Sequence, residues 1–173
     1  TGYFFIIFKK DLYEYKKTNI FISEGVSMKI LLTGSNGQLG HDFQKLFDKL
    51  NIEYLATDYE ELDITNEISI ENFFENNNDF DMIINCAAYN DVDKAEIDNE
   101  LCKKLNTYAP KKLAEISKKI GAVFVTYSTD FVFNGKEKTP LLENVLPNPL
   151  SIYGESKSAG ERAVLDAYNK SFV

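Results

Sequence analysis

Residues 28–40 constrain the fold more than any other part of the chain, because three glycines join a short apolar run to a helical pattern. The run at 30–32 is typical of a buried parallel strand, and apolar residues then recur with helical spacing up to Leu50. A strand that turns through glycines into a helix presents backbone N–H groups and the positive end of the helix dipole. The segment therefore predicts a binding loop for the pyrophosphate of a dinucleotide.

Each glycine has its own expected role. Gly34 permits the tight turn off the strand, Gly37 lets a pyrophosphate approach the backbone, and Gly40 allows the helix to pack closely on the sheet. The GxxGxxG spacing differs from the commonest GxGxxG fingerprint and indicates the short-chain dehydrogenase/reductase type of Rossmann domain. A plain turn before a helix is the alternative interpretation.

Strand and helix patterns alternate along the rest of the chain. Further strands are expected at 52–57, 81–89 and 122–126, with helical patterns between them. This alternation predicts an α/β fold, a doubly wound parallel sheet of the NAD(P)-binding Rossmann type. Residues 171–173 resemble the start of another strand, so we expect the fold to be truncated at its C-terminal end.

Signals for helix ends accompany this pattern. Thr65 or Asn66 is expected to cap a helix that carries Ile68, Phe73 and Phe74. The helical pattern over residues 93–121 contains Thr107 and Pro110 as markers of a break or restart, with Gly121 as its stop.

Residues 1–27 differ from the remainder and are interpreted as an upstream extension, with Met28 as the natural start. The apolar run at 4–8 is too short to span a bilayer. A peripheral helix or edge strand is the alternative. Residues 28–173 then form one dinucleotide-binding domain that carries the catalytic residues.

Composition excludes several classes of function. A net charge of −8 without a basic block argues against nucleic acid, and no segment predicts a membrane partner. Cys86 and Cys102 lack CxxC spacing and a histidine cluster, so neither a metal site nor a disulfide scaffold is expected, and a reducing cytoplasm fits best. His41, the only histidine, is expected on a helix surface rather than in catalysis.

Two predicted strands end at residues suited to a cofactor. Asp58 follows the second strand, where a carboxylate would meet the adenosine ribose, although a solvated strand-end carboxylate is the alternative. No arginine follows to accept a 2′-phosphate, which favours NAD over NADP slightly. Ala87 and Ala88 follow the third strand and are small enough to let a cofactor pass.

Hydroxyl groups and a Tyr/Lys pair suggest the chemistry. Thr129 follows the fourth strand, with Ser128 as a competitor, and Tyr153 and Lys157 stand four apart on a predicted helix. An ammonium beside a phenol favours proton transfer, so Tyr153 could protonate a carbonyl oxygen during hydride transfer while a hydroxyl stabilises the oxyanion. Lys157 would also hold the nicotinamide ribose.

Two further YxxxK matches show that the spacing alone proves little. One begins at Tyr13 and the other at Tyr108. Position decides between the three, because only Tyr153 follows both a hydroxyl-rich strand end and a proline-containing loop.

Six segments together carry a resemblance: MKILLTGSNGQLG, LDIT, INCAAYNDVDKAE, NTYAP, YSTDFVFNG and YGESKSAGE. From Met28 onward the chain resembles the dTDP-4-dehydrorhamnose reductase family. The members of this family are atypical extended short-chain reductases. The resemblance implies NADPH or NADH as cofactor and a nucleotide-sugar substrate, and it leaves a homodimer of the full-length protein open. It also implies a C-terminal substrate domain that the chain lacks. Asn90 and Asp91 depart from the small or hydroxyl residues usual after the third strand.

The resemblance implies roles for individual residues. Gly37, Gln38 and Leu39 would contact the cofactor phosphates, between Gly34 and Gly40. The other expected site residues are Asp63 and Ile64 at the adenine, Ala87, Ala88, Tyr89 and Tyr127 along the cofactor path, Thr129, Tyr153 and Lys157 in catalysis, and Asp130 beside the substrate.

Two other functions stay open. The chain also resembles regulatory subunits of methionine adenosyltransferase. A protein of that kind would keep the Rossmann fold and bind the cofactor without catalysing a reaction. Another extended reductase or an epimerase would share the same three catalytic residues. The intact set of Thr129, Tyr153 and Lys157 favours an enzyme.

Overall fold

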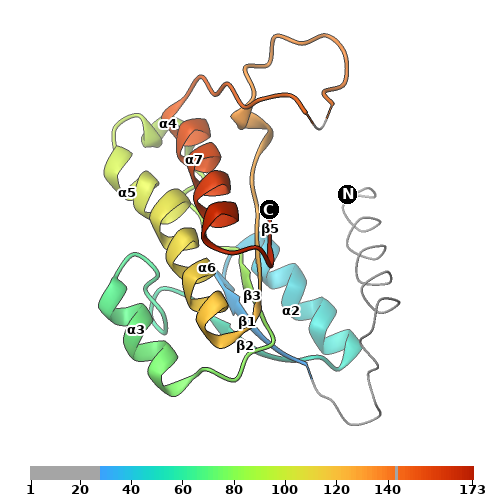
Figure 1. The fold of residues 1–173 in the computed structure, drawn as a ribbon, viewed down its shortest axis with the longest axis vertical. Coiled ribbons are helices and arrows are strands. Elements are labelled where there is room, and N and C mark those ends of the chain that lie inside the picture. Colours follow the sequence, from blue (N-terminus) through green and yellow to red (C-terminus); the bar gives the residue numbers. More distant parts are fainter. Residues whose placement is uncertain (1–27, 143) are drawn as a thin grey trace.

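The computed structural model describes residues 28–142 and 144–173, so the predicted upstream extension lies outside the described residues. Five strands form one parallel sheet in the order β2-β1-β3-β4-β5 (Figure 1). The chain runs outward from β1 to β2, returns to β3 beside β1, and continues to β4 and β5. This order confirms the predicted doubly wound sheet and puts its switch point between β1 and β3. The strands are β1 (Lys29–Thr33), β2 (Glu53–Thr57), β3 (Met82–Asn85), β4 (Val123–Thr126) and β5 (Ser171–Phe172).

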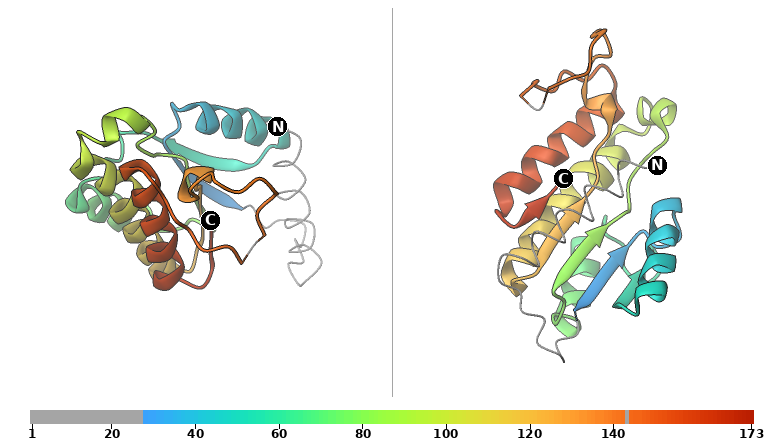
Figure 2. Two further views of the ribbon diagram at one scale, coloured as in Figure 1. Left: turned by 90° about the horizontal axis from the view of Figure 1, so that it is seen from above. Right: turned by 90° about the vertical axis from the view of Figure 1, so that its right-hand side faces the viewer.

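Helices cover both faces of the sheet. One face carries α2, and the other carries α3, α6 and α7, as the view from above shows (Figure 2). Within residues 28–142 and 144–173, no helix is long and apolar enough to cross a membrane. The helices are α2 (Gln38–Leu50), α3 (Glu67–Asn76), α4 (Val92–Ala95), α5 (Asn99–Lys103), the π-helix η1 (Lys104–Tyr108), α6 (Ala109–Ile120), the 3₁₀-helix η2 (Asp130–Val132) and α7 (Ile152–Ala167).

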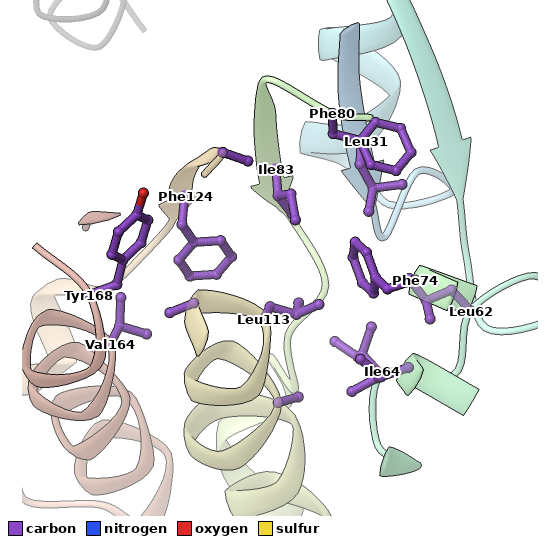
Figure 3. Packing of buried hydrophobic residues seen from close by; sticks show 14 residues of the cluster. Leu31, Leu62, Ile64, Phe74, Phe80, Ile83, Leu113, Phe124, Val164 and Tyr168 are labelled. Atoms are coloured by element: carbon purple, nitrogen blue, oxygen red, sulfur yellow. The ribbon is translucent and has the colours of Figure 1, made fainter. Parts of the chain in front are cut away.

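Alternation along the strands divides the core into two layers. Leu31, Ile83 and Phe124 are fully buried on the face toward α3, α6 and α7 (Figure 3). Ile30 and Ile84 point to the opposite face, beneath α2. Burying one such side chain contributes about 1.5–3 kcal/mol, so β1 and β3 are held from both sides. The sheet therefore gives a rigid base for the loops at its carboxyl edge.

Most of the predicted helix ends are found where the sequence placed them. The Asn66 side chain caps α3 by accepting from the backbone of Ile68 and Ser69. Gly121 ends α6 in the left-handed conformation, at φ 83°, and Pro110 lies in the first turn of that helix. The helical region before it is less regular than its periodicity suggests, because a turn separates α4 from α5.

The π-helix η1 replaces the simple break expected near Thr107. It joins α5 to α6 without leaving the helical path, and it buries Asn106. A Cβ built on Gly160 of α7 would lie 2.1 Å from the Asn106 carbonyl oxygen. The absence of a side chain at this position therefore lets α7 pack directly on the π-helix.

Because of this contact, we expect a substitution that usually stabilises a helix to destabilise the protein at this position. Gly→Ala in a helix interior usually stabilises by about 0.5–1 kcal/mol. Gly160→Ala should instead lower the free energy of unfolding by about 1–3 kcal/mol, because the added methyl group overlaps backbone. Urea denaturation measures the change. Glu155→Ala, at an exposed position of the same helix, is the control and should change stability by less than about 0.5 kcal/mol. A stabilised Gly160→Ala variant would contradict the packing.

Candidate functional site

The glycine loop lies at the switch point of the sheet. Gly34 has φ 68°, and a Cβ on it would be 2.4 Å from the Ala87 backbone nitrogen. The ends of β1 and β3 thus approach one another closely only because residue 34 has no side chain. A Cβ on Gly40 would lie 2.4 Å from the Gly34 carbonyl oxygen. Gly40 therefore packs α2 against the loop itself, whereas the sequence pattern predicted packing on the sheet.

The first turn of α2 is suited to an anion. Gly37 is its N-cap and offers no side-chain cap, and no acidic residue lies in the first turn. The first N–H groups of a helix have no partner within it, so those of Gln38 and Leu39 can face a phosphate. A Cβ on Gly37 would lie 3.3 Å from the Gly34 carbonyl oxygen. The loop fits a dinucleotide pyrophosphate.

Asp58 lies beside this loop, as expected of a ribose ligand. Its Oδ2 accepts from the Asn36 backbone N–H at 2.9 Å, and its Oδ1 accepts from that of Tyr59 at 2.8 Å. A carboxylate has about four acceptor positions, so two bonds leave capacity for a ribose hydroxyl. The carboxylate also orients the backbone of the glycine loop.

Asp63 and Ile64 form a turn after β2. The Asp63 Oδ1 accepts from the backbone and hydroxyl of Thr65, at 2.9 and 2.7 Å. Ile64 is 5% exposed, and its side chain packs in the core toward α3 and α6. Any contact of Ile64 with an adenine would therefore come from its backbone.

Asn106 organises the exit of β3 and was missed by the sequence analysis. Its Oδ1 accepts from the Tyr89 backbone N–H at 2.9 Å, and its Nδ2 donates to the Tyr89 carbonyl oxygen at 3.0 Å. The same Nδ2 is 3.1 Å from the Ser156 Oγ on α7. Asn106 thus fixes the segment of Ala87 and Ala88 that is expected to line the cofactor path. A buried asparagine inside a helical pattern was the available signal, since asparagine is disfavoured there without a specific partner.

The exit of β4 is attached to α7. The Lys157 Nζ donates to the Tyr127 carbonyl oxygen at 2.5 Å, and the Ser128 hydroxyl donates to the Glu161 carboxylate. The Tyr127 ring packs near Phe43 of α2, with centroids 6.2 Å apart, so its side chain belongs to the core beneath α2. Tyr127 therefore holds Lys157 through its backbone, a role that its side-chain chemistry did not predict.

Thr129 and Tyr153 belong to segments in direct contact. Phe131, two residues after Thr129, packs edge-on against the Tyr153 ring with centroids 5.6 Å apart. A Cβ on Gly154 would lie 2.3 Å from the Phe131 carbonyl oxygen. Asp130 accepts from the Thr129 hydroxyl at 3.3 Å, next to this contact. The structure thus brings the β4 exit and the start of α7 together.

Burial changes the acid–base properties of two groups here. Lys157 is 9% exposed, and burial lowers its pKa from the ordinary value of 10.5, while the nearby Glu161 carboxylate raises it. Burial raises the pKa of the Cys86 thiol to about 12. Lys157 is therefore a cation of the site whose pKa is shifted by burial, and the Cys86 thiol is protonated at neutral pH.

The other described YxxxK match has a structural explanation. Tyr108 is 58% exposed, and the Lys112 Nζ pairs with the Glu71 carboxylate at 3.0 Å. This lysine links α6 to α3. The match that begins at Tyr13 lies outside the described residues.

The buried ammonium predicts a stability that depends on pH. A lysine with a lowered folded-state pKa opposes folding while it is charged, and the cost disappears as pH rises toward 10.5. Lys157→Met removes this cost, so the free energy of unfolding of the variant relative to the parent should be more favourable at pH 7 than at pH 10. Urea denaturation of both proteins at pH 7 and pH 10 measures this difference. A relative stability that does not change between the two pH values would contradict the burial cost.

Together, the order of the parallel sheet and the glycine loop at its switch point define a Rossmann-type fold. The sequence model of the RmlD substrate binding domain matches residues 28–173. The chain belongs to this family.

Several proteins similar to this chain are named dTDP-4-dehydrorhamnose reductases. A dTDP-4-dehydrorhamnose reductase of Aggregatibacter actinomycetemcomitans is 38% identical over 149 residues, which are 84% of this chain and 49% of that protein. A solved dTDP-4-dehydrorhamnose reductase of Clostridium acetobutylicum is 43% identical with a TM-score of 0.80, over 83% of this chain and 51% of that one. A solved dTDP-4-dehydrorhamnose reductase of Bacillus anthracis, in complex with NADP, is 35% identical with a TM-score of 0.81, over 87% of this chain and 53% of that one. The chain spans about half the length of the relatives it matches.

Proposed function

We propose that this chain carries the cofactor loop and catalytic groups of an NAD(P)H-dependent reductase acting on the 4-keto group of a nucleotide sugar, dTDP-4-dehydrorhamnose. The contact between the Thr129 segment and Tyr153, beside Lys157 and at the sheet edge that carries the glycine loop, is the observation that supports this most. The names of the relatives support the choice of substrate.

Each residue has a defined task in this proposal. Tyr153 donates a proton to the carbonyl oxygen, and the Thr129 hydroxyl donates a hydrogen bond to the same oxygen. An ammonium has three donors, so Lys157 can keep its bond to Tyr127 and still hold a ribose hydroxyl. Bound NAD(P)H would supply the hydride.

The binding residues complete the proposal. Gln38 and Leu39 would bind the pyrophosphate through their N–H groups, and Asp58 would bind the adenosine ribose. Asp63 and the Ile64 backbone would lie at the adenine, and Asp130 beside the sugar. Two unpaired cysteines, one with a raised pKa, are compatible with a cytoplasmic location as part of the same proposal.

The cofactor assignment is tested at Gly37. Gly37→Val adds bulk where the pyrophosphate would approach the backbone, so it should weaken NADPH and NADH binding by about tenfold or more. Fluorescence titration measures the affinity. His41→Val, on the exposed surface of the same helix, is the control and should bind like the parent. Equal binding by Gly37→Val would show that the loop is not the pyrophosphate site.

The catalytic assignment is tested at Tyr153. Because the chain spans half of its relatives, activity is measured in a chimera that adds the unmatched half of the Clostridium acetobutylicum reductase. Tyr153→Phe should lower kcat about 100-fold or more, with little change in NADPH affinity, because it removes a proton donor used in the transition state. NADPH oxidation with dTDP-4-dehydrorhamnose measures it.

Tyr108→Phe is the matched control, since it alters an exposed tyrosine with the same YxxxK spacing, and it should retain parental kcat. If Tyr153→Phe is as active as the parent, Tyr153 is not the proton donor. If the chimera binds NADPH but reduces no keto sugar, a cofactor-binding regulatory role becomes the better interpretation.

A further inference from the structure

The face of α7 that carries Lys157 also carries Glu161, one turn later. Lys157 bonds to the carbonyl oxygen of Tyr127, and Glu161 accepts from the hydroxyl of Ser128. The two partners are consecutive residues directly after β4. One helix face therefore attaches to the β4 exit at two successive points.

The residue after these two points is Thr129. Its hydroxyl accepts from the Phe131 N–H and donates to Asp130, both at 3.3 Å, so its bonds are made within its own turn. The position of that hydroxyl relative to Tyr153 then depends on the backbone that leads into the turn. One attachment at Tyr127 would leave that backbone free to pivot, and the second attachment at Ser128 removes this freedom.

Glu161 also places a negative charge near a buried ammonium. Lys157 is 9% exposed, and its hydrogen-bond acceptor at Tyr127 is a neutral carbonyl. Among the described residues, Glu161 from α7 favours its charged form against burial, and Cys102 from α5 does so as a thiolate. Of the two, Glu161 is the carboxylate, and it is only partly buried.

We propose that Glu161 is a positioning residue of this site: it fixes the β4 exit through Ser128, and so the place of Thr129, and its carboxylate, one helical turn from Lys157, favours the ammonium form of that side chain. The statement about Thr129 depends on the proposed reductase function. The attachment and the charge effect do not, because both concern contacts within this chain.

Three variants separate the two roles. Glu161→Gln keeps an acceptor oxygen for Ser128 but removes the charge, whereas Ser128→Ala removes the attachment and keeps the charge. Glu155→Gln removes a carboxylate from an exposed position of the same helix and is the control. Backbone amide spectra of each variant, compared with the parent, verify that the fold is retained.

The charge role is tested without substrate or cofactor. In the 173-residue chain labelled with ¹³C at the lysine Cε, the signal of Lys157 is assigned by its loss in Lys157→Arg and followed with pH. Glu161→Gln should lower the titration midpoint of Lys157 by about one pH unit, and neither Ser128→Ala nor Glu155→Gln should move it. An unchanged midpoint in Glu161→Gln would refute the charge role.

The positioning role is tested in the chimera described above. Ser128→Ala should lower kcat about tenfold while the KM for the sugar and the affinity for NADPH stay near parental values, because misplacement of Thr129 affects the transition state. Glu161→Gln should shift the alkaline limb of the kcat profile to lower pH by the amount seen for Lys157. A parental kcat in Ser128→Ala would refute the positioning role.

The two proposals fail in different ways. If the parent chimera reduces no keto sugar, the reductase function is wrong, and the lysine titration still decides the charge role of Glu161. If the parent is active and the titration does not respond to Glu161→Gln, the charge role is wrong and the function stands.

Discussion

The close approach of Gly34 to the backbone of Ala87 is the constraint on which the rest of the site depends. It lets β1 and β3 end side by side at the switch point, where a doubly wound sheet opens toward a ligand. A side chain at Gly34 would separate the two strand ends and displace the start of α2. The glycine turn and the exit of β3 are therefore parts of a single packing arrangement.

The fold could be predicted because its signals are local. Buried apolar runs, the Asn66 cap and the Gly121 stop each act within a few residues, and all three appear as expected. The turn after α4 and the π-helix were not predicted. Both lie in a region whose helical periodicity continues, and the contact of the π-helix with Gly160 of α7 involves residues far apart in the sequence.

The candidate site was predictable only in part, for a physical reason. Asp58 and the Tyr153/Lys157 pair carry chemistry in their side chains, so residue type and strand-end position pointed to them. Asn106 and Tyr127 act by holding backbone or by offering a backbone carbonyl. No side-chain pattern encodes such a role, because the partner atoms belong to residues far away in the sequence. Whether the assigned residues act in catalysis stays a prediction.

The two bonds between Asn106 and Tyr89 have a consequence for how the sequence can vary. Both bonds go to main-chain atoms, so they hold the strand exit in place whatever side chains it carries. Asn90 and Asp91 follow directly after this anchored point, and the Asp91 side chain caps α4 by accepting from the Lys94 N–H. The exposed side chain of Asn90 can therefore vary while the exit of β3 stays in place, whereas the carboxylate of Asp91 is tied to the start of α4.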